Sequence, residues 1–423
     1  PPLTSSAEIR RRLDPSQALL SFHWTASGLF AAFEHRGRLV AWQVKQAAEL
    51  PTELMALTKE LSLYERAGSV ATDRLLAGDW RGSVARIERM LFENSRGVSL
   101  VDGIEELIIV PDGWLWYLPF EILPIASNRA GDDSRPLRDL CRIRYAPTRS
   151  LAVMRFEPRA AGLTVGLTGR MTRGEKADAA AASVAAMLGG ERSVAVECLK
   201  GTPSPMLIGS LADTLLIYDE LAATEAATVP FLTAAAGRQG MTSADWLAPP
   251  TKWPQRVVLP GFQSALGGGL AKLPPRPGEE LFLTATDLIA AGAHTAVVSR
   301  WRTGGLTCTM LMEEFLRDVT AGEPAASAWQ RAVDVVMPEP PDLAREPRLT
   351  PSPKGELTDS WHPLLWAGYV LVDCGDGGGG GDKAPAAPAA AVPPLPQRPQ
   401  PPAAAEPPMP PAILAPPPPR PEP

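Results

Sequence analysis

The stretch RVVLPGFQSALGGG, residues 256–269, predicts a buried strand that ends in a loop of small residues. Its apolar run, Val257 to Leu259, is typical of a strand and is stopped by a Pro-Gly pair. In an open α/β sheet, the loop after the carboxyl end of a strand usually carries the functional residues. Here that loop offers Phe262, Gln263 and Ser264, and none of them is by itself a strong nucleophile, base or metal ligand.

Strands and helices alternate on both sides of this stretch. Further strands are expected at residues 107–110, 142–145, 163–167, 193–197, 214–218, 295–299 and 366–372, and helices at 177–190, 280–293 and 306–322. Several of the strands, such as LIIV, LLIY and TAVVS, are apolar throughout, as expected when helices cover both faces of a sheet. The alternation predicts an α/β fold with a mostly parallel central sheet flanked by helices.

The N-terminal part of the chain has a different pattern of apolar residues. Three short apolar runs at residues 18–25, 28–35 and 38–44 are separated by turn signals and predict an antiparallel β-meander. Two helical patterns follow, at 52–67 and 72–92. The sequence leaves open whether this meander is a separate subdomain or an extension of the main sheet.

These differences in sequence pattern and composition divide the chain into four parts. We expect residues 1–18 to be a linker from an upstream region, 19–104 to hold the meander and the helical pair, and 105–373 to form the α/β core. Residues 374–423 are rich in Gly and then in Pro and Ala. They cannot bury enough apolar area to offset chain entropy, so a disordered tail is expected there.

Composition excludes several classes of protein. The chain has 423 residues and a net charge of -6, so it lacks the excess of positive charge that is typical of proteins that bind nucleic acid. It has no run of 18 apolar residues, so no membrane span is expected. The four cysteines, Cys141, Cys198, Cys308 and Cys374, lack metal-ligand spacing, which favours a reducing, cytoplasmic setting without a zinc site. No cofactor is expected.

Four segments in series resemble the CHAT domain, a caspase-like module often found beside tetratricopeptide repeats in bacteria. They are ELIIVPDGWLWYLPFEIL (106–123), LCRIRYAPTRSLAV (140–153), DLIAAGAHTAVVSRWRTGG (287–305) and HPLLWAGYVLVD (362–373). The resemblance implies the caspase and separase fold, a mostly parallel sheet flanked by helices. It also implies a catalytic histidine and a catalytic cysteine, each in a loop at the carboxyl end of a strand.

Both members of that dyad are replaced in this chain. In the family, the histidine lies in a segment like HxATHG, and the matching segment DTLLIYDELAA (213–223) has Glu220 there. The family cysteine lies in a segment like LSACxTG, and LPGFQSAL (259–266) has Phe262 at that position. A thiolate nucleophile and its histidine base are therefore both missing. The resemblance predicts a catalytically inactive pseudopeptidase that serves as a protein-binding, scaffold or regulatory module.

Two alternatives stay open. One is a peptidase with a relocated nucleophile, either Ser264 with Glu220 as its base or Cys308 near a helix start. A carboxylate is a poor base for a serine hydroxyl, and Cys308 lies in an apolar helix pattern typical of packed residues. The other is a regulatory chain that pairs with another caspase-like chain or with a repeat domain.

A vestigial cleft is a further expectation. Polar and aromatic residues that follow the predicted strands would hold a peptide without cleaving it: Glu220, Gln263, Ser264, Arg300, Trp301 and Arg302.

Overall fold

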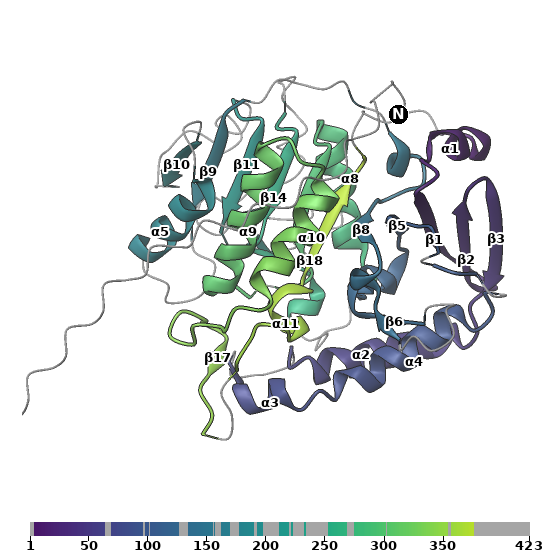
Figure 1. Cartoon of the computed structure of the whole chain (residues 1–423), viewed down its shortest axis with the longest axis horizontal. Helices are drawn as coiled ribbons and strands as arrows, with labels where there is room; N and C mark the ends of the chain where they lie inside the picture. Colours follow the sequence, from purple (N-terminus) through teal and green to yellow (C-terminus); the bar gives the residue numbers. More distant parts are fainter. Residues whose placement is uncertain are drawn as a thin grey trace, which may run out of the picture. The chain divides into compact units, whose positions relative to one another are not determined.

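A computed structural model describes most of the chain before residue 376, and Figure 1 shows its elements. The described residues are 4–63, 69–95, 98–100, 102–126, 134–154, 156, 162–169, 177–189, 193–197, 211–219, 221–222, 232–233, 253–268, 275–301, 303–353 and 357–375. All of them belong to one compact unit, Pro1–Gly379. The expected tail lies outside the described residues apart from its first two positions.

A large sheet organises the described part of the chain. Its eleven strands follow the order β10 (Ser193–Glu197), β9 (Thr164–Thr168), β11 (Thr214–Tyr218), β14 (Arg256–Leu259), β16 (Thr295–Ser299), β18 (Tyr369–Asp373), β8 (Arg142–Tyr145), β5 (Glu106–Val110), β1 (Gln17–Thr25), β2 (Gly28–His35) and β3 (Arg38–Gln43). Neighbours are parallel except at β16–β18, β1–β2 and β2–β3. The predicted mostly parallel sheet is confirmed.

Strand β18 joins the two halves of this sheet. It pairs antiparallel with β16 along its whole length and parallel with β8, where Val372 lies opposite Tyr145. All five of its residues are buried. Without β18, the strands from β10 to β16 and the strands from β8 to β3 would be two separate sheets.

The predicted strand at 366–372 was wrong at its start. Residues 363–366 form a short helix, α11 (Pro363–Trp366), and β18 begins only at Tyr369. The helical turn is favoured because Pro363 occupies its first position and the His362 side chain accepts a hydrogen bond from the Leu364 N–H. The residues of this turn are apolar and buried, so their sequence resembles that of a buried strand.

The N-terminal meander extends the main sheet. Strand β1 pairs parallel with β5, from Gln17 opposite Glu106 to Ser21 opposite Val110. Before it, within the expected linker, α1 (Ser6–Arg12) buries Ile9 against the sheet. The front of the chain therefore shares the sheet of the α/β core.

The helical pair is present as α2 (Leu50–Glu60) and α4 (Trp80–Phe92). The pattern at 72–92 is not one continuous helix, because α3 (Thr72–Leu76) ends before Gly78, which has a φ of 69°. That left-handed conformation breaks a helix and is readily adopted by glycine.

Helices cover the faces of the sheet. They include α5 (Ala177–Leu188), α8 (Glu279–Ala291), α9 (Gly305–Thr320) and α10 (Ala325–Val336), and Figure 1 shows α9 and α10 side by side, with α10 next to β18. The sequence analysis missed α10, although its buried residues, such as Trp329 and Val333, recur with helical spacing. No helix in the described ranges is long and apolar enough to cross a membrane.

The remaining elements are short. The strands are β4 (Val70–Ala71), β6 (Pro124–Ile125), β7 (Arg135–Pro136), β12 (Leu221–Ala222), β13 (Leu232–Thr233), β15 (Phe262–Gln263) and β17 (Leu349–Thr350), and the 3-10 turns are η1 (Ala47–Glu49), η2 (Gly113–Tyr117), η3 (Phe120–Ile122), η4 (Leu137–Asp139), η5 (Leu151–Val153) and η6 (Ala265–Gly268).

Two glycines with similar backbone angles allow a matched test of packing at the start of α8. Gly278 has a φ of 77°, and a Cβ there would lie 2.2 Å from the Gly113 carbonyl oxygen. Gly37 has a φ of 74° and open space around the same position. We expect Gly37→Ala to cost about 1 kcal/mol from its backbone alone. Gly278→Ala should cost about 1–3 kcal/mol more because of the clash. Urea unfolding of both variants measures the difference, and equal losses would contradict the predicted clash.

Candidate functional site

Three neighbouring parallel strands, β11, β14 and β16, end at the same edge of the sheet. The loops that leave them carry the positions singled out in the sequence. Glu220 and Arg302 lie outside the described residues, and so does the side chain of Gln263. The described members of the predicted cleft are Ser264, Arg300 and Trp301, with Phe262 at the family cysteine position.

A small sheet brings the loops after β11 and β14 together. Strand β12 pairs parallel with β15, so that Leu221 lies opposite Phe262. The Leu221 N–H also donates to the Gly261 carbonyl at 3.0 Å. The segment with the family histidine position therefore lies beside the segment with the family cysteine position.

Phe262 is a core residue, with no exposed surface. Its backbone is fixed from β16, because the Ser299 hydroxyl donates to the Phe262 carbonyl and lies 3.1 Å from the Pro260 carbonyl. A phenyl ring has no lone pair or acidic proton for acyl transfer. At this position the side chain contributes packing.

Ser264 is held by the backbone around it. Its hydroxyl donates to the Arg300 carbonyl and accepts from the Leu266 N–H at 3.1 Å. Only 3% of the residue is exposed. The hydroxyl proton is therefore used in a buried hydrogen bond to the backbone.

Glu280, in the first turn of α8, fixes the same loop from the other side. Its Oε1 accepts from the Ala265 N–H at 3.0 Å and from the Tyr117 hydroxyl at 2.7 Å. Burial, together with this carboxylate, raises the pKa of Tyr117 and keeps it a hydrogen-bond donor. The sequence analysis did not assign Glu280 to the site. Its only signal was an acidic residue at a predicted helix start.

The two amides after Ser264 are thus both used within the protein. An oxyanion hole needs N–H groups aimed at the place where negative charge develops on the substrate. Here the Ala265 N–H is bonded to Glu280 and the Leu266 N–H to Ser264. Neither amide is available to a substrate carbonyl in this arrangement.

Arg300 is fully buried and connects the end of β16 to two other segments. Its Nε donates to the Trp116 carbonyl at 3.0 Å, and its Nη1 lies 3.2 Å from the carbonyls of both Ala367 and Tyr369. Its main-chain N–H donates to the Gly368 carbonyl. The guanidinium group therefore binds η2 to the start of β18.

Glu121 and Tyr145 complete the surroundings of this guanidinium group. The Glu121 Oε2 lies 3.8 Å from Nη1 of Arg300, and the Arg300 Cζ lies 5.0 Å from the centre of the Tyr145 ring. Burial raises the pKa of Glu121, and the charge of Arg300 opposes that shift. The sequence analysis missed Glu121, whose signal was a lone carboxylate in the apolar run LPFEIL.

Trp301 is also fully buried, and its indole N–H donates to the Leu364 carbonyl of α11 at 2.9 Å. Neither Arg300 nor Trp301 offers its side chain to a bound peptide in this structure. Both side chains hold the sheet edge to the segment that leads into β18. The predicted placement of these two in an open cleft is corrected, because their polar atoms are needed inside the core.

Comparison with known proteins agrees with two of the four segments quoted above, residues 287–305 and 362–373. Residues 235–373 match the family model described as CHAT domain. This part of the chain resembles a CHAT domain. The matched range includes β14, β16 and β18, and thus Phe262, Ser264 and Arg300.

Solved structures support the same fold. Two crystal structures of the Saccharomyces cerevisiae separase–securin complex match, with TM-scores of 0.53 and 0.50 and 9% identity. In both cases the match covers 87% of this chain and 30% of the other chain. At this identity the likeness shows the fold alone. No curated protein matches the chain.

Cys308, the other candidate nucleophile, lies in the first turn of α9 and has no exposed surface. The start of this helix is capped by Glu346, whose Oε1 accepts from the Thr307 N–H and the Thr307 hydroxyl, each at 2.7 Å. Burial raises the pKa of Glu346 to about 7, although these hydrogen bonds favour its charged form. No local pattern points to this cap, because Glu346 lies 39 residues from Thr307 in the chain.

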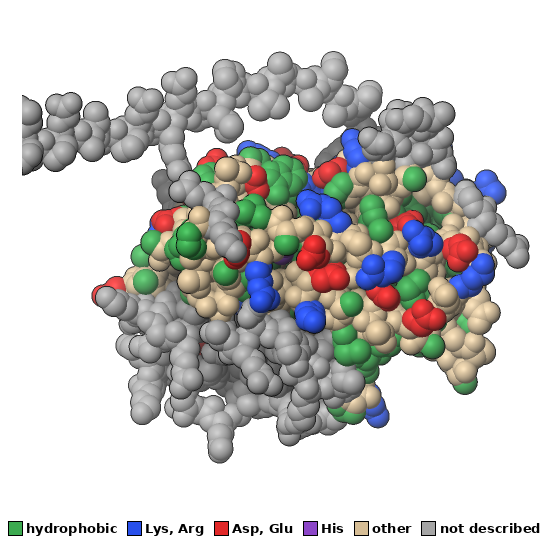
Figure 2. Space-filling model, turned by 90° about the horizontal axis from the view of Figure 1, so that it is seen from below, with side chains coloured by type: hydrophobic (Ala, Val, Ile, Leu, Met, Phe, Trp, Pro, Cys, Tyr) green, Lys and Arg blue, Asp and Glu red, His purple; other side chains and the backbone are tan. Residues whose placement is uncertain are grey.

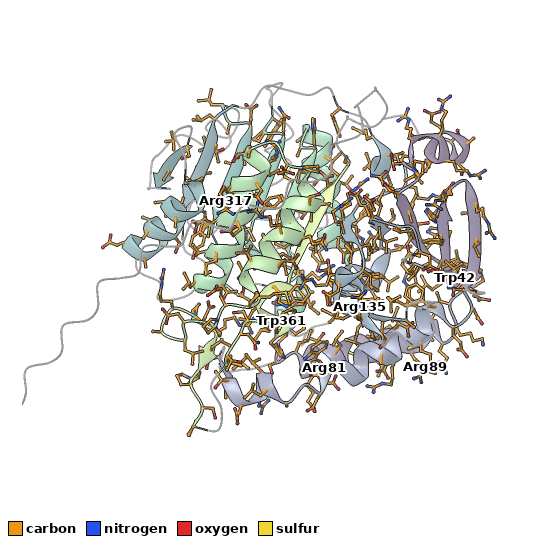
Figure 3. The ribbon with its side chains drawn as sticks, viewed as in Figure 1. Trp42, Arg81, Arg89, Arg135, Arg317 and Trp361 are labelled. Atoms are coloured by element: carbon orange, nitrogen blue, oxygen red, sulfur yellow. The ribbon has the colours of Figure 1, made fainter. Side chains whose placement is uncertain are left out.

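A cavity of about 270 Å³ opens at the opposite edge of the sheet, near the starts of β9 and β11. Thr164, Thr214 and Arg317 are among its lining residues, and Figure 3 labels Arg317 on α9. The cavity is therefore separate from the loops that follow β11, β14 and β16. Among the described residues, no three or more His, Cys, Asp or Glu side chains are grouped so as to hold a metal ion.

The raised pKa of Glu346 predicts a pH dependence of stability. The folded protein keeps a proton on Glu346 up to about pH 7, whereas a carboxyl group with the ordinary pKa of 4.5 releases it earlier. The folded state thus binds more protons in this window, and the free energy of unfolding should fall as pH rises through it. Between pH 5 and 8 we expect a loss of about 2 kcal/mol from this group.

Urea unfolding at both pH values tests this, with Glu346→Gln as the control. The amide keeps an oxygen acceptor for Thr307 but does not titrate. The control should show a smaller loss between the two pH values. An equal loss in both proteins would assign the pH dependence to other groups.

Proposed function

We propose that this CHAT domain is a catalytically inactive pseudopeptidase that works as a protein-binding, scaffold or regulatory module. The observation that carries the proposal is the buried Phe262 at the family cysteine position. Glu220 occupies the family histidine position in the sequence. The core that surrounds the family site is formed, and the reactive groups of the family are replaced.

The surroundings of Phe262 support the same conclusion. Cysteine-type peptide cleavage needs a nucleophile, a base and donors for the oxyanion. The loop has no thiol, and the amides of Ala265 and Leu266 are bonded within the protein. Rebuilding the reaction would require more than the return of a single side chain.

The alternative of a relocated nucleophile has less support. The Ser264 hydroxyl donates to the Arg300 carbonyl and is almost fully buried. Cys308 is inaccessible in α9. A peptide could reach neither group without a local rearrangement of the core.

A protein or peptide is the partner that this proposal implies. In the matching solved structures, separase is in complex with securin, a protein partner. For this chain we infer a partner that is another caspase-like chain or a repeat domain. Cys141, Cys308 and Cys374 are buried and form no disulfide bond, which supports a reducing, cytoplasmic setting as part of the proposal.

The central test is a search for catalysis by the full chain. The protein is incubated with a peptide library read by mass spectrometry, and in parallel with a fluorophosphonate probe and a chloromethyl ketone probe. We expect no cleavage and no labelled residue, because the loop lacks a nucleophile and free oxyanion donors. The variants Ser264→Ala and Cys308→Ala identify the source of any signal. Turnover that disappears in either variant would overturn the proposal and establish a relocated nucleophile.

The partner proposal predicts a larger particle in cells than the purified chain alone. Native purification from the source cells, followed by light scattering and mass spectrometry, should recover a second caspase-like or repeat-containing chain in a fixed ratio. A persistent monomer throughout would contradict this choice of partner.

A further inference from the structure

One group of polar atoms in the core has no hydrogen-bond partner among the described residues. The atoms are Glu121 Oε2, Tyr145 Oη and Arg300 Nη2. The surface offers no feature as distinctive, because cationic, acidic and apolar side chains of the described residues are interleaved on the face that Figure 2 shows. Polar groups at the surface are hydrated, whereas buried ones are nearly always bonded to protein atoms or to ordered water.

The three atoms belong to neighbouring side chains. Glu121 Oε2 lies 3.8 Å from Nη1 of Arg300, and the Arg300 Cζ lies 5.0 Å from the centre of the Tyr145 ring. Burial raises the pKa of Tyr145 well above its usual value, and the charges of Arg300 and Glu121 act on that pKa in opposite directions. The hydroxyl group therefore keeps its proton and lies close to both charged groups.

The site is closed to bulk solvent. The exposed fraction is 7% for Glu121, 1% for Tyr145 and zero for Arg300. A buried donor or acceptor that has lost its hydration without gaining a partner destabilises the folded state. Three such atoms in one place point to a bound molecule that replaces their hydration.

The Arg300 side chain cannot turn to find other partners. Its Nε donates to a carbonyl of η2, and its Nη1 donates to carbonyls at the start of β18. Because the guanidinium group is planar and rigid, these bonds also fix the direction of the Nη2 hydrogens. The Tyr145 ring packs edge to face against Phe120, with 6.3 Å between centroids. Both donors are thus held in position.

We propose that these side chains form a binding site for a single internal water molecule. The water oxygen accepts from Arg300 Nη2, one of its hydrogens is donated to Glu121 Oε2, and it shares a further hydrogen bond with the Tyr145 hydroxyl. About three hydrogen bonds are usual for a buried water. Two hydrogen bonds of about 2.9 Å bridge atoms up to about 5.8 Å apart, so one water can join groups that do not touch.

Other small ligands fit the site less well. A metal ion would be repelled by the guanidinium group beside the only carboxyl oxygen. An anion would meet the lone pairs of that same oxygen, and a larger molecule is excluded by the burial of all three side chains. Water carries a donor and an acceptor in one atom group, as this set of partners requires.

The bound water would join three separate parts of the fold. Glu121 lies in η3, Tyr145 ends β8, and Arg300 follows β16. These segments lie on both sides of β18, so the water adds a link between the two halves of the sheet. The inference goes beyond the proposed function and holds whether or not the chain cleaves peptides.

The first test is a high-resolution crystal structure of the full chain, grown with bromide in the buffer. We expect a density peak about 2.5–3.2 Å from Glu121 Oε2, Tyr145 Oη and Arg300 Nη2, without anomalous signal from bromide. A direct bond between Tyr145 and Glu121 with no peak between the side chains would overturn the inference. An anomalous peak would also overturn it, because the ligand would then be an anion.

The second test counts long-lived internal waters in solution by oxygen-17 magnetic relaxation dispersion. Tyr145→Phe removes one of the three partners, and we expect it to lower the count by about one. Tyr117→Phe is the matched control, because the buried Tyr117 hydroxyl donates directly to Glu280 at 2.7 Å. The control should leave the count unchanged. An unchanged count in Tyr145→Phe, or an equal loss in the control, would contradict the proposed site.

Circular dichroism establishes that both variants are folded before the waters are counted. If Tyr145→Phe does not fold, the crystal structure of the unaltered chain decides the question alone.

Discussion

The buried guanidinium group of Arg300 is the interaction on which the rest of the structure depends. It follows β16 directly and binds the carbonyls of Trp116, Ala367 and Tyr369, which belong to η2 and to the start of β18. Each hydrogen bond to a charged group contributes about 1.5–3 kcal/mol, and each carbonyl left without a donor carries a desolvation penalty. Because β18 unites the two halves of the sheet, this single cation holds together segments that are distant in the sequence.

The same network explains the state of the loop at the family cysteine position. The carbonyl of Arg300 accepts the Ser264 hydroxyl, so the loop after β14 is bonded to the backbone of the residue that organises the core. Glu280 holds the loop from α8 through Ala265. In an active peptidase, the equivalent groups must be free to meet a substrate. Here they are hydrogen-bonded within the protein, and the fold by itself does not establish a reaction.

Local sequence was a good guide to the strands and a poor one to the site. The bounds of β8, β10, β11 and β16 were predicted residue for residue, because short apolar runs between turn signals leave little choice. The strand predicted at 366–372 began too early, because Trp366 ends the helical turn α11 and the apolar residues around it show no clear periodicity. The helix α10 was overlooked despite its regular apolar face.

The contacts of the site join residues that are far apart in the sequence. Arg300 binds a carbonyl 184 residues earlier, and Tyr117 binds Glu280 at a separation of 163 residues. In the sequence, Arg300 is only a basic residue beside a tryptophan, and nothing local distinguishes it from an exposed arginine. Its burial follows from the position of β18 between β16 and β8, which strand patterns alone do not specify.

The central position of β18 also has a consequence for synthesis of the protein. A ribosome makes β8 and β16 well before β18, so the growing chain contains two partial sheets whose inner edges have no partner. Unpaired edges of this kind are prone to join with other chains. The two inner edges therefore stay without their native partner until residue 373 has left the exit tunnel.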